Sequence, residues 1–221
     1  MPNRVRLLAV MVPLCVTSAA AQGDSARALE PATQQWRVGV FVGVAHNSPV
    51  SANLGVTPGR DHVFVGLQAS TAVVRVGEAS IAYGAQLLPL VAVRGRSVPV
   101  SYNGPTNPDG TLPGPDVAYA VGVSPFGLEV GLPVGGRVRA YGAAAAGGLL
   151  FTRPFPVPEA RRLNFTLEYG GGMLVRSGRD RWIQLGYKYH HLSNAYTAML
   201  NPGLDAHVFY AGYEWSVRLP R

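Results

Sequence analysis

The feature of this sequence that most constrains its fold is a two-residue alternation of apolar and other side chains. From Trp36 to Ala45 every second residue is Trp or Val, and the residues between them are Arg, Gly, Phe and Ala. From residue 183 to residue 189, Ile, Leu and Tyr alternate in the same way with Gln, Gly and Lys. Because neighbouring side chains of a strand point to opposite faces, this period predicts strands with one apolar face. The sequence contains no sustained helical period, so an all-β fold is predicted.

Eight segments carry this pattern, and the links between them alternate in length. The expected strands are residues 36–46, 62–76, 79–94, 117–125, 137–152, 163–176, 181–193 and 206–217. The short links are residues 77–79, 131–136 and 177–180, and the long links are residues 47–61, 95–116, 153–162 and 194–205. An even number of strands joined alternately by tight turns and long loops is typical of outer-membrane barrels.

Two folds agree with the alternation. A secreted sandwich or lipocalin-like domain buries its apolar faces, whereas a membrane barrel turns them toward lipid. The link lengths favour the second fold, as do strands longer than the roughly nine to eleven residues that cross a bilayer. We therefore predict that residues 36–221 form an eight-stranded antiparallel transmembrane β-barrel of the bacterial outer membrane.

The first residues have the composition of an export signal. Two arginines precede a short apolar run at residues 7–16, and an Ala-x-Ala type cleavage site follows at residues 18–22. We expect a cleaved signal peptide at residues 1–21 and a lead-in segment at residues 22–35. Lipid attachment at Cys15 is the alternative, and the bulky leucine before that cysteine disfavours it.

Charge and cysteine usage narrow the possible functions. Cleavage would remove the only cysteine, which excludes disulfides, thiol catalysis and cysteine-based metal sites. The formal charge of the whole chain is +7. Because the chain carries an export signal, we expect lipid phosphates rather than nucleic acid to be the anionic partner.

Residues 188–207, KYHHLSNAYTAMLNPGLDAH, hold the polar side chains of a candidate site. His191 and Ser193 are two residues apart, so a strand places them on the same face with Cα atoms about 6.5 Å apart. Serine catalysis needs this pairing of base and nucleophile. Asp205 opens the next strand, and an antiparallel hairpin returns it to the same level. On residues alone a polar loop without catalysis remains open, and His190 is expected to be a packed inward side chain.

The segment GYKYHHLSNA…NPGLDAHVFYAGYEW resembles the outer-membrane lipid A 3-O-deacylases of the PagL type, broadly termed acyloxyacyl hydrolases. The segments SPFGLEV (124–130), GGLLFTRPFPVP (147–158) and LNFTLEYGGG (163–172) share this resemblance, which extends over roughly residues 120–215. It implies an eight-stranded barrel with a catalytic triad on its outer face. The triad would consist of His191, Ser193 and Asp205, with Asp where the family has Glu. Asn201 would stabilise the oxyanion, and Asn194 would shape the site.

The resemblance also implies a reaction, namely hydrolysis of a lipid A ester through an acyl-enzyme, without metal or cofactor. Ser193 would attack the ester carbonyl while His191 removes its proton, and backbone N–H groups near Asn194 and Ala195 would assist Asn201. Water would then release a 3-hydroxy fatty acid. Because Asp is one methylene shorter than Glu, we expect Asp205→Glu to keep or raise activity.

The expected partners follow from this resemblance. They are lipopolysaccharide as substrate and the outer-membrane lipids, with a homodimer left open. Six arginines near the external strand ends could pair with lipid A phosphates or only anchor the barrel: Arg60, Arg94, Arg96, Arg153, Arg161 and Arg162. The alternative to an enzyme is a non-catalytic eight-stranded barrel with a structural or adhesion role. A solute channel is disfavoured because side chains fill so narrow a barrel.

Overall fold

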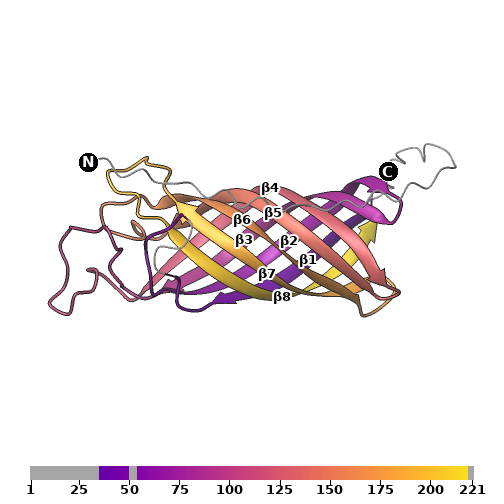
Figure 1. The fold of residues 1–221 in the computed structure, drawn as a ribbon, viewed down its shortest axis with the longest axis horizontal. Helices are drawn as coiled ribbons and strands as arrows, with labels where there is room; N and C mark the ends of the chain where they lie inside the picture. Colours follow the sequence, from indigo (N-terminus) through magenta and orange to yellow (C-terminus); the bar gives the residue numbers. More distant parts are fainter. Residues whose placement is uncertain (1–34, 50–53, 219–221) are drawn as a thin grey trace, which may run out of the picture.

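The computed structural model describes residues 35–49 and 54–218. They form a closed barrel of eight antiparallel strands in which β8 returns to pair with β1 (Figure 1). The strands are β1 (Gln35–Ala45), β2 (Asp61–Val76), β3 (Ala79–Arg94), β4 (Val117–Gly135), β5 (Val138–Phe151), β6 (Leu163–Arg176), β7 (Arg181–Ser193) and β8 (Leu204–Arg218). The expected eight-stranded, all-β architecture is confirmed. Among the described residues, no helix is long and apolar enough to span a membrane.

The predicted ends of the strands lie within two residues of the observed ends, with one exception. β4 continues to Gly135, whereas the sequence predicted an end at residue 125 and a separate link at 131–136. Its pairing with β5 shifts register between Val123 and Phe126 and again between Pro133 and Gly135. Because a bulge relieves a strand of the hydrogen bond that proline cannot donate, β4 accommodates prolines within its length. The predicted signal peptide (1–21) and residues 22–34 of the lead-in segment lie outside the described residues.

The long loops and the tight turns lie at opposite ends of the barrel. Figure 1 shows the four long loops at one end and the tight turns at the other. The described residues of the long loops are 46–49 and 54–60, 95–116, 152–162 and 194–203. In outer-membrane barrels the long loops face the exterior of the cell. The end of the barrel that carries the long loops is therefore the external end.

The apolar face of the strands points away from the barrel axis. In β1, Val40, Val42 and Val44 are 43%, 51% and 52% exposed, whereas Phe41 and Ala45, which belong to the opposite face, are buried in the lumen. A soluble sandwich would bury such a face, while a barrel surrounded by lipid must expose it. The direction of the alternation therefore identifies a membrane barrel.

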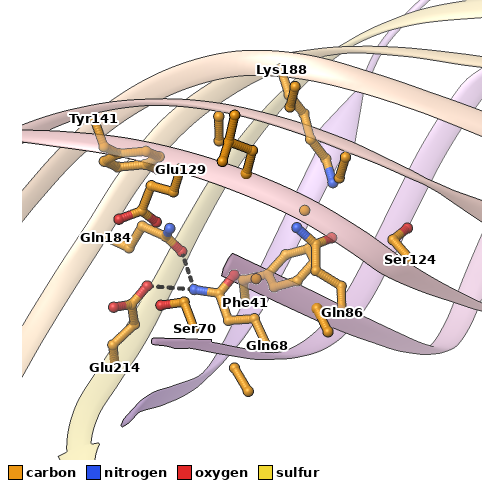
Figure 2. Close-up of a pocket in the computed structure, with 18 of the residues that line it drawn as sticks. Phe41, Gln68, Ser70, Gln86, Ser124, Glu129, Tyr141, Gln184, Lys188 and Glu214 are labelled. Carbon is orange, nitrogen blue, oxygen red and sulfur yellow. Dashed lines mark hydrogen bonds between the residues drawn. The ribbon is translucent and has the colours of Figure 1, made fainter. Parts of the chain in front are cut away.

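Side chains fill the lumen except at its tight-turn end, where Arg37, Arg139 and Trp182 are among the residues that line a cavity of about 330 Å³. Beneath the external loops lies an apolar cluster that includes Phe64, Leu149 and Leu192. Nearer the tight turns the lumen is polar, and Gln68 Nε2 donates hydrogen bonds to Gln184 Oε1 (2.8 Å) and Glu214 Oε1 (2.6 Å) (Figure 2). A cavity of about 70 Å³ remains among these polar side chains. A lumen packed in this way leaves the outer surface and the loops as the places for a functional site.

Candidate active site

His191 and Ser193 lie on the outer face of β7, near the external end. They continue the row of Leu185 and Tyr187, which are 47% and 37% exposed on the outside of the barrel. Asp205 on β8 likewise has the parity of outward-facing Phe209, which is 63% exposed. All three candidate triad residues therefore belong to the lipid-facing side of the sheet.

The imidazole of His191 and the carboxylate of Asp205 are in contact. His191 Nδ1 donates a hydrogen bond to Asp205 Oδ1 at 2.7 Å, and the two residues are direct partners in the β7–β8 register. Because Asp205 lies directly opposite the histidine, the shorter side chain of Asp reaches the ring. A carboxylate on Nδ1 fixes the ring and leaves Nε2 as the nitrogen that can accept a proton.

The second oxygen of Asp205 is held by the loop between β1 and β2. Oδ2 accepts hydrogen bonds from the backbone N–H groups of Leu54 (3.0 Å) and Gly55 (2.9 Å), and the residue is only 1% exposed. Val56 N, in the same loop, donates to Pro202 O at 2.9 Å. Charge-assisted bonds to both oxygens hold the carboxylate in one orientation. Sequence reasoning missed these donors, because backbone N–H groups have no signature in residue type.

Ser193 sits directly opposite Phe165 in the β6–β7 register and is partly exposed. In the part of the chain that the structure describes, no hydrogen bond joins its hydroxyl to His191. Hydrogen bonds between nucleophile and base are often long without substrate and tighten only in the reacting complex. The two groups share a face, as the spacing predicted, and their proton-transfer contact is not formed in this state.

The two asparagines of the site bind to each other. Asn201 Oδ1 accepts a hydrogen bond from Asn194 N at 2.8 Å, so this N–H is not the free oxyanion donor that we expected. The Asn201 Nδ2 group is the part of that side chain that can donate to an oxyanion. Asn194 Nδ2 donates to Leu200 O (2.7 Å), and Asn194 O accepts from Thr197 N (3.0 Å) and Oγ1 (2.7 Å). Asn194 therefore organises the loop after β7.

The same loop has an unusual backbone. Ala195 and Tyr196 have φ values of 51° and 58°, in the left-handed region that residues with a side chain rarely adopt. Gly203 has φ of 60°, and a Cβ atom at this position would lie 3.2 Å from His191 Cε1. The glycine of the NPG turn therefore lies against the imidazole, which gives this motif a part in the site.

His190, the neighbour of the candidate base, faces the lumen. Its Nδ1 atom donates to Glu168 Oε1 at 2.7 Å, and Lys188 Nζ donates to Glu168 Oε2 at 2.8 Å. All three side chains are buried. His190 is thus a packed polar residue, as the sequence predicted.

One of the six rim arginines is not available to a ligand. Arg60 is 2% exposed, and its Nε and Nη2 atoms donate to Ser97 Oγ (3.2 Å) and Ser97 O (2.9 Å). Burial, followed by the charge of Arg153, lowers the pKa of Arg60 to about 10. Its guanidinium also lies over the Phe155 ring at 5.6 Å. Arg60 therefore joins two external loops, and the idea that it pairs with a phosphate is corrected.

The fold and the site define a class: an outer-membrane β-barrel with histidine, serine and aspartate grouped on its lipid-facing side. A family model described as "Lipid A 3-O-deacylase (PagL)" matches residues 102–214, slightly more than half of the chain. The chain belongs to this PagL family, as its sequence motifs suggested. The protein is therefore located in the outer membrane.

A solved structure shows the same fold. The crystal structure of the outer membrane enzyme PagL aligns with a TM-score of 0.58 at 13% identity, covering 79% of this chain and 97% of that chain. Neisserial surface protein A (TM-score 0.46, 12% identity, 83% and 97% covered) and Ail of Yersinia pestis (0.42, 13%, 83% and 97%) are more distant. A comparison with curated proteins finds no match.

Proposed function

We propose that this protein is an outer-membrane serine esterase that removes an ester-linked 3-hydroxyacyl chain from the lipid A of lipopolysaccharide. The observation that carries the proposal is the hydrogen bond between His191 and Asp205 on the lipid-facing side of the sheet, with Ser193 two residues further along the same face. Membership of the lipid A 3-O-deacylase family supplies the substrate.

The residues can be assigned to the steps of ester hydrolysis. Ser193 Oγ attacks the ester carbonyl while His191 Nε2 accepts its proton, and Asp205 stabilises the imidazolium that forms. Asn201 Nδ2 donates to the oxyanion. The tetrahedral intermediate collapses to an acyl-serine, and the sugar oxygen leaves with the proton from His191. Water, deprotonated by His191, then attacks the acyl-serine, which releases the fatty acid and restores Ser193.

The outer position of the site suits this substrate. The acyl chains of a membrane glycolipid lie beside the barrel, and Phe165, opposite Ser193, is 47% exposed on that side. The lumen behind the site is closed by buried Leu192 and Leu204. An ester at the boundary between sugar and acyl chain can therefore reach Ser193 from the lipid, but not through the lumen.

The direct experiment incubates the purified protein with lipopolysaccharide in detergent and examines the lipid A by mass spectrometry. We expect the loss of one 3-hydroxyacyl group, abolished in Ser193→Ala and in His191→Ala. Ser101→Ala and His46→Ala serve as matched controls, because both residues are exposed at the external end outside the site, and they should retain activity. Intact lipid A with the unmutated protein over a range of pH and detergents would refute the esterase.

The second candidate is a non-catalytic barrel in which these residues only stabilise a hairpin. The missing hydrogen bond between Ser193 and His191 among the described residues favours it. A fluorophosphonate probe distinguishes the two candidates, because it modifies only a serine activated by a base. Labelling of Ser193 that disappears in His191→Ala supports the enzyme, and an unlabelled Ser193 supports the structural role.

A further inference from the structure

An open groove lies on the outside of the barrel beside Ser193. It has a volume of about 570 Å³ and is formed by the end of β5, the loop that follows, the start of β6 and Thr197. One of its lining residues is Phe165, the direct partner of Ser193 in the β6–β7 register. The groove therefore reaches the residue that lies directly opposite the candidate nucleophile.

The lower part of the groove is apolar. Leu150, Leu163 and Phe165 line it and are 47%, 49% and 47% exposed on the lipid-facing side. A surface of this kind, level with Ser193 and open to the membrane, matches an acyl chain that lies along the barrel.

The upper edge of the groove is cationic. Arg161 Nε donates to Thr197 O and Arg162 Nε donates to Phe151 O, both at 2.9 Å. Both side chains belong to exposed residues, and within the described ranges neither forms an ion pair with an acidic side chain. Guanidinium groups fixed through Nε present their terminal nitrogens as a fork, the geometry that binds phosphate oxygens.

The spacing connects the two parts. Arg162 precedes Phe165 by three residues, which is roughly 10 Å along an extended chain. A phosphate on the same sugar as the reacting ester, or on the adjoining one, can span this interval. Arg161 is also linked to the site, because Thr197, which accepts its hydrogen bond, donates two bonds to Asn194 O.

We propose that this groove binds the phosphorylated sugar of the substrate, with its phosphate on Arg161 and Arg162 and an acyl chain against Leu163 and Phe165. The inference rests on the proposed function and adds a specificity determinant to it. Phospholipid headgroups carry the same chemistry, and the sugar phosphate is assigned because the groove reaches Phe165, which lies directly opposite Ser193.

The kinetic test uses the double variant Arg161→Gln/Arg162→Gln and two substrates: phosphorylated lipid A and its dephosphorylated form with the same acyl chains. For the phosphorylated substrate we expect KM to rise by about 10-fold or more while kcat changes by less than about 2-fold. For the dephosphorylated substrate, KM should be the same in the double variant and in the unmutated protein. An equal KM for phosphorylated lipid A in the two proteins would overturn the proposal.

Two further variants make the result specific. Arg179→Gln/Arg181→Gln removes the same charge from exposed arginines at the opposite end of the barrel and should leave KM unchanged. Arg161→Lys/Arg162→Lys keeps the charge but loses the fork, and KM should lie between those of the parent and the Gln pair. A rise in KM of the same size in the Arg179/Arg181 pair would show a general charge effect and overturn the assignment.

Binding to an inactive protein separates this inference from the proposed function. In Ser193→Ala, isothermal titration with lipid A in detergent should show tighter binding of the phosphorylated form, and the preference should disappear when Arg161 and Arg162 are changed to Gln. Phosphate-dependent binding without hydrolysis by the unmutated protein would refute the esterase alone. Hydrolysis without phosphate-dependent binding would refute this groove alone. Equally tight binding of phosphatidylglycerol would make it a general headgroup site and also overturn the proposal.

Discussion

At the scale of single residues, Asp205 is held from two sides. Its Oδ1 accepts from His191 at 2.7 Å and its Oδ2 accepts from two backbone N–H groups, in a position that is 1% exposed. The family's Glu would need space for one more methylene here. The contacts around the carboxylate therefore explain how Asp can reach the imidazole from this position, and they leave little room for a longer acid.

Two substitutions of Asp205 test this arrangement. Asp205→Asn keeps the size but no longer stabilises the imidazolium, so kcat should fall by about 100-fold to 10,000-fold. Asp205→Glu should lower activity by about 10-fold or more, because the extra methylene displaces the ring or the loop. This replaces the expectation from sequence that Glu would keep or raise activity. Deacylation rates check both variants. An active Glu variant would show that the backbone of residues 54 and 55 moves to accommodate the longer side chain.

Gly203 is the second residue with a clear prediction. Gly203→Ala places a side chain at φ of 60° and a Cβ atom 3.2 Å from His191 Cε1, so kcat/KM should fall by about 10-fold as the ring shifts. Gly110→Ala is the matched control, because Gly110 has φ of 78° and its Cβ would meet nothing within 4 Å. Equal activities of the two variants would show that contact with the imidazole does not matter.

At the scale of elements, the site depends on the loop between β1 and β2 as well as on the β7–β8 hairpin. A Cβ atom at Gly55 would lie 2.7 Å from Asp205 N and 2.8 Å from Leu204 Cα, both rigid backbone atoms. The loop therefore approaches β8 closely only because residue 55 is glycine.

Gly55→Ala should move this loop and release Asp205 Oδ2. We expect deacylation to fall by about 10-fold or more while the barrel still folds, because the strands themselves are unaffected. Circular dichroism gives the folded fraction, and mass spectrometry of lipid A gives the rate. Gly136→Ala, in a tight turn where a Cβ would meet nothing within 4 Å, is the control. Full activity in Gly55→Ala would mean that the loop does not position the acid.

At the scale of the whole molecule, the barrel turns its apolar surface to lipid. On β4, Leu128 is 53% exposed and lies about midway along the strand, while Val134 is 68% exposed near the tight-turn end. Leu128→Arg should lower the free energy of unfolding in lipid vesicles by about 2–4 kcal/mol, and Val134→Arg by about 0–1 kcal/mol. Urea titrations measure both, and equal losses would contradict the inferred position of the membrane. The signal peptide at residues 1–21 stays a prediction, which the N-terminal mass of the exported protein tests.

The sequence by itself determined the strands, their order and the side of the sheet on which His191, Ser193 and Asp205 lie. These properties are local, because the two-residue period of a strand assigns each side chain to a face. The end of β4 was predicted too early because prolines disfavour a strand. The chain accommodates these prolines through bulges, which depend on the pairing with β5.

Only the tertiary structure decided how the site is completed. The register brings Asp205 opposite His191, and Gly55 N reaches the same carboxylate across 150 positions of sequence. Loops that meet at the external end likewise decide that Arg60 is buried. They also decide that the N–H of Asn194 binds Asn201. Contacts between such distant segments are set by closure of the barrel, and backbone N–H groups carry no mark in the sequence.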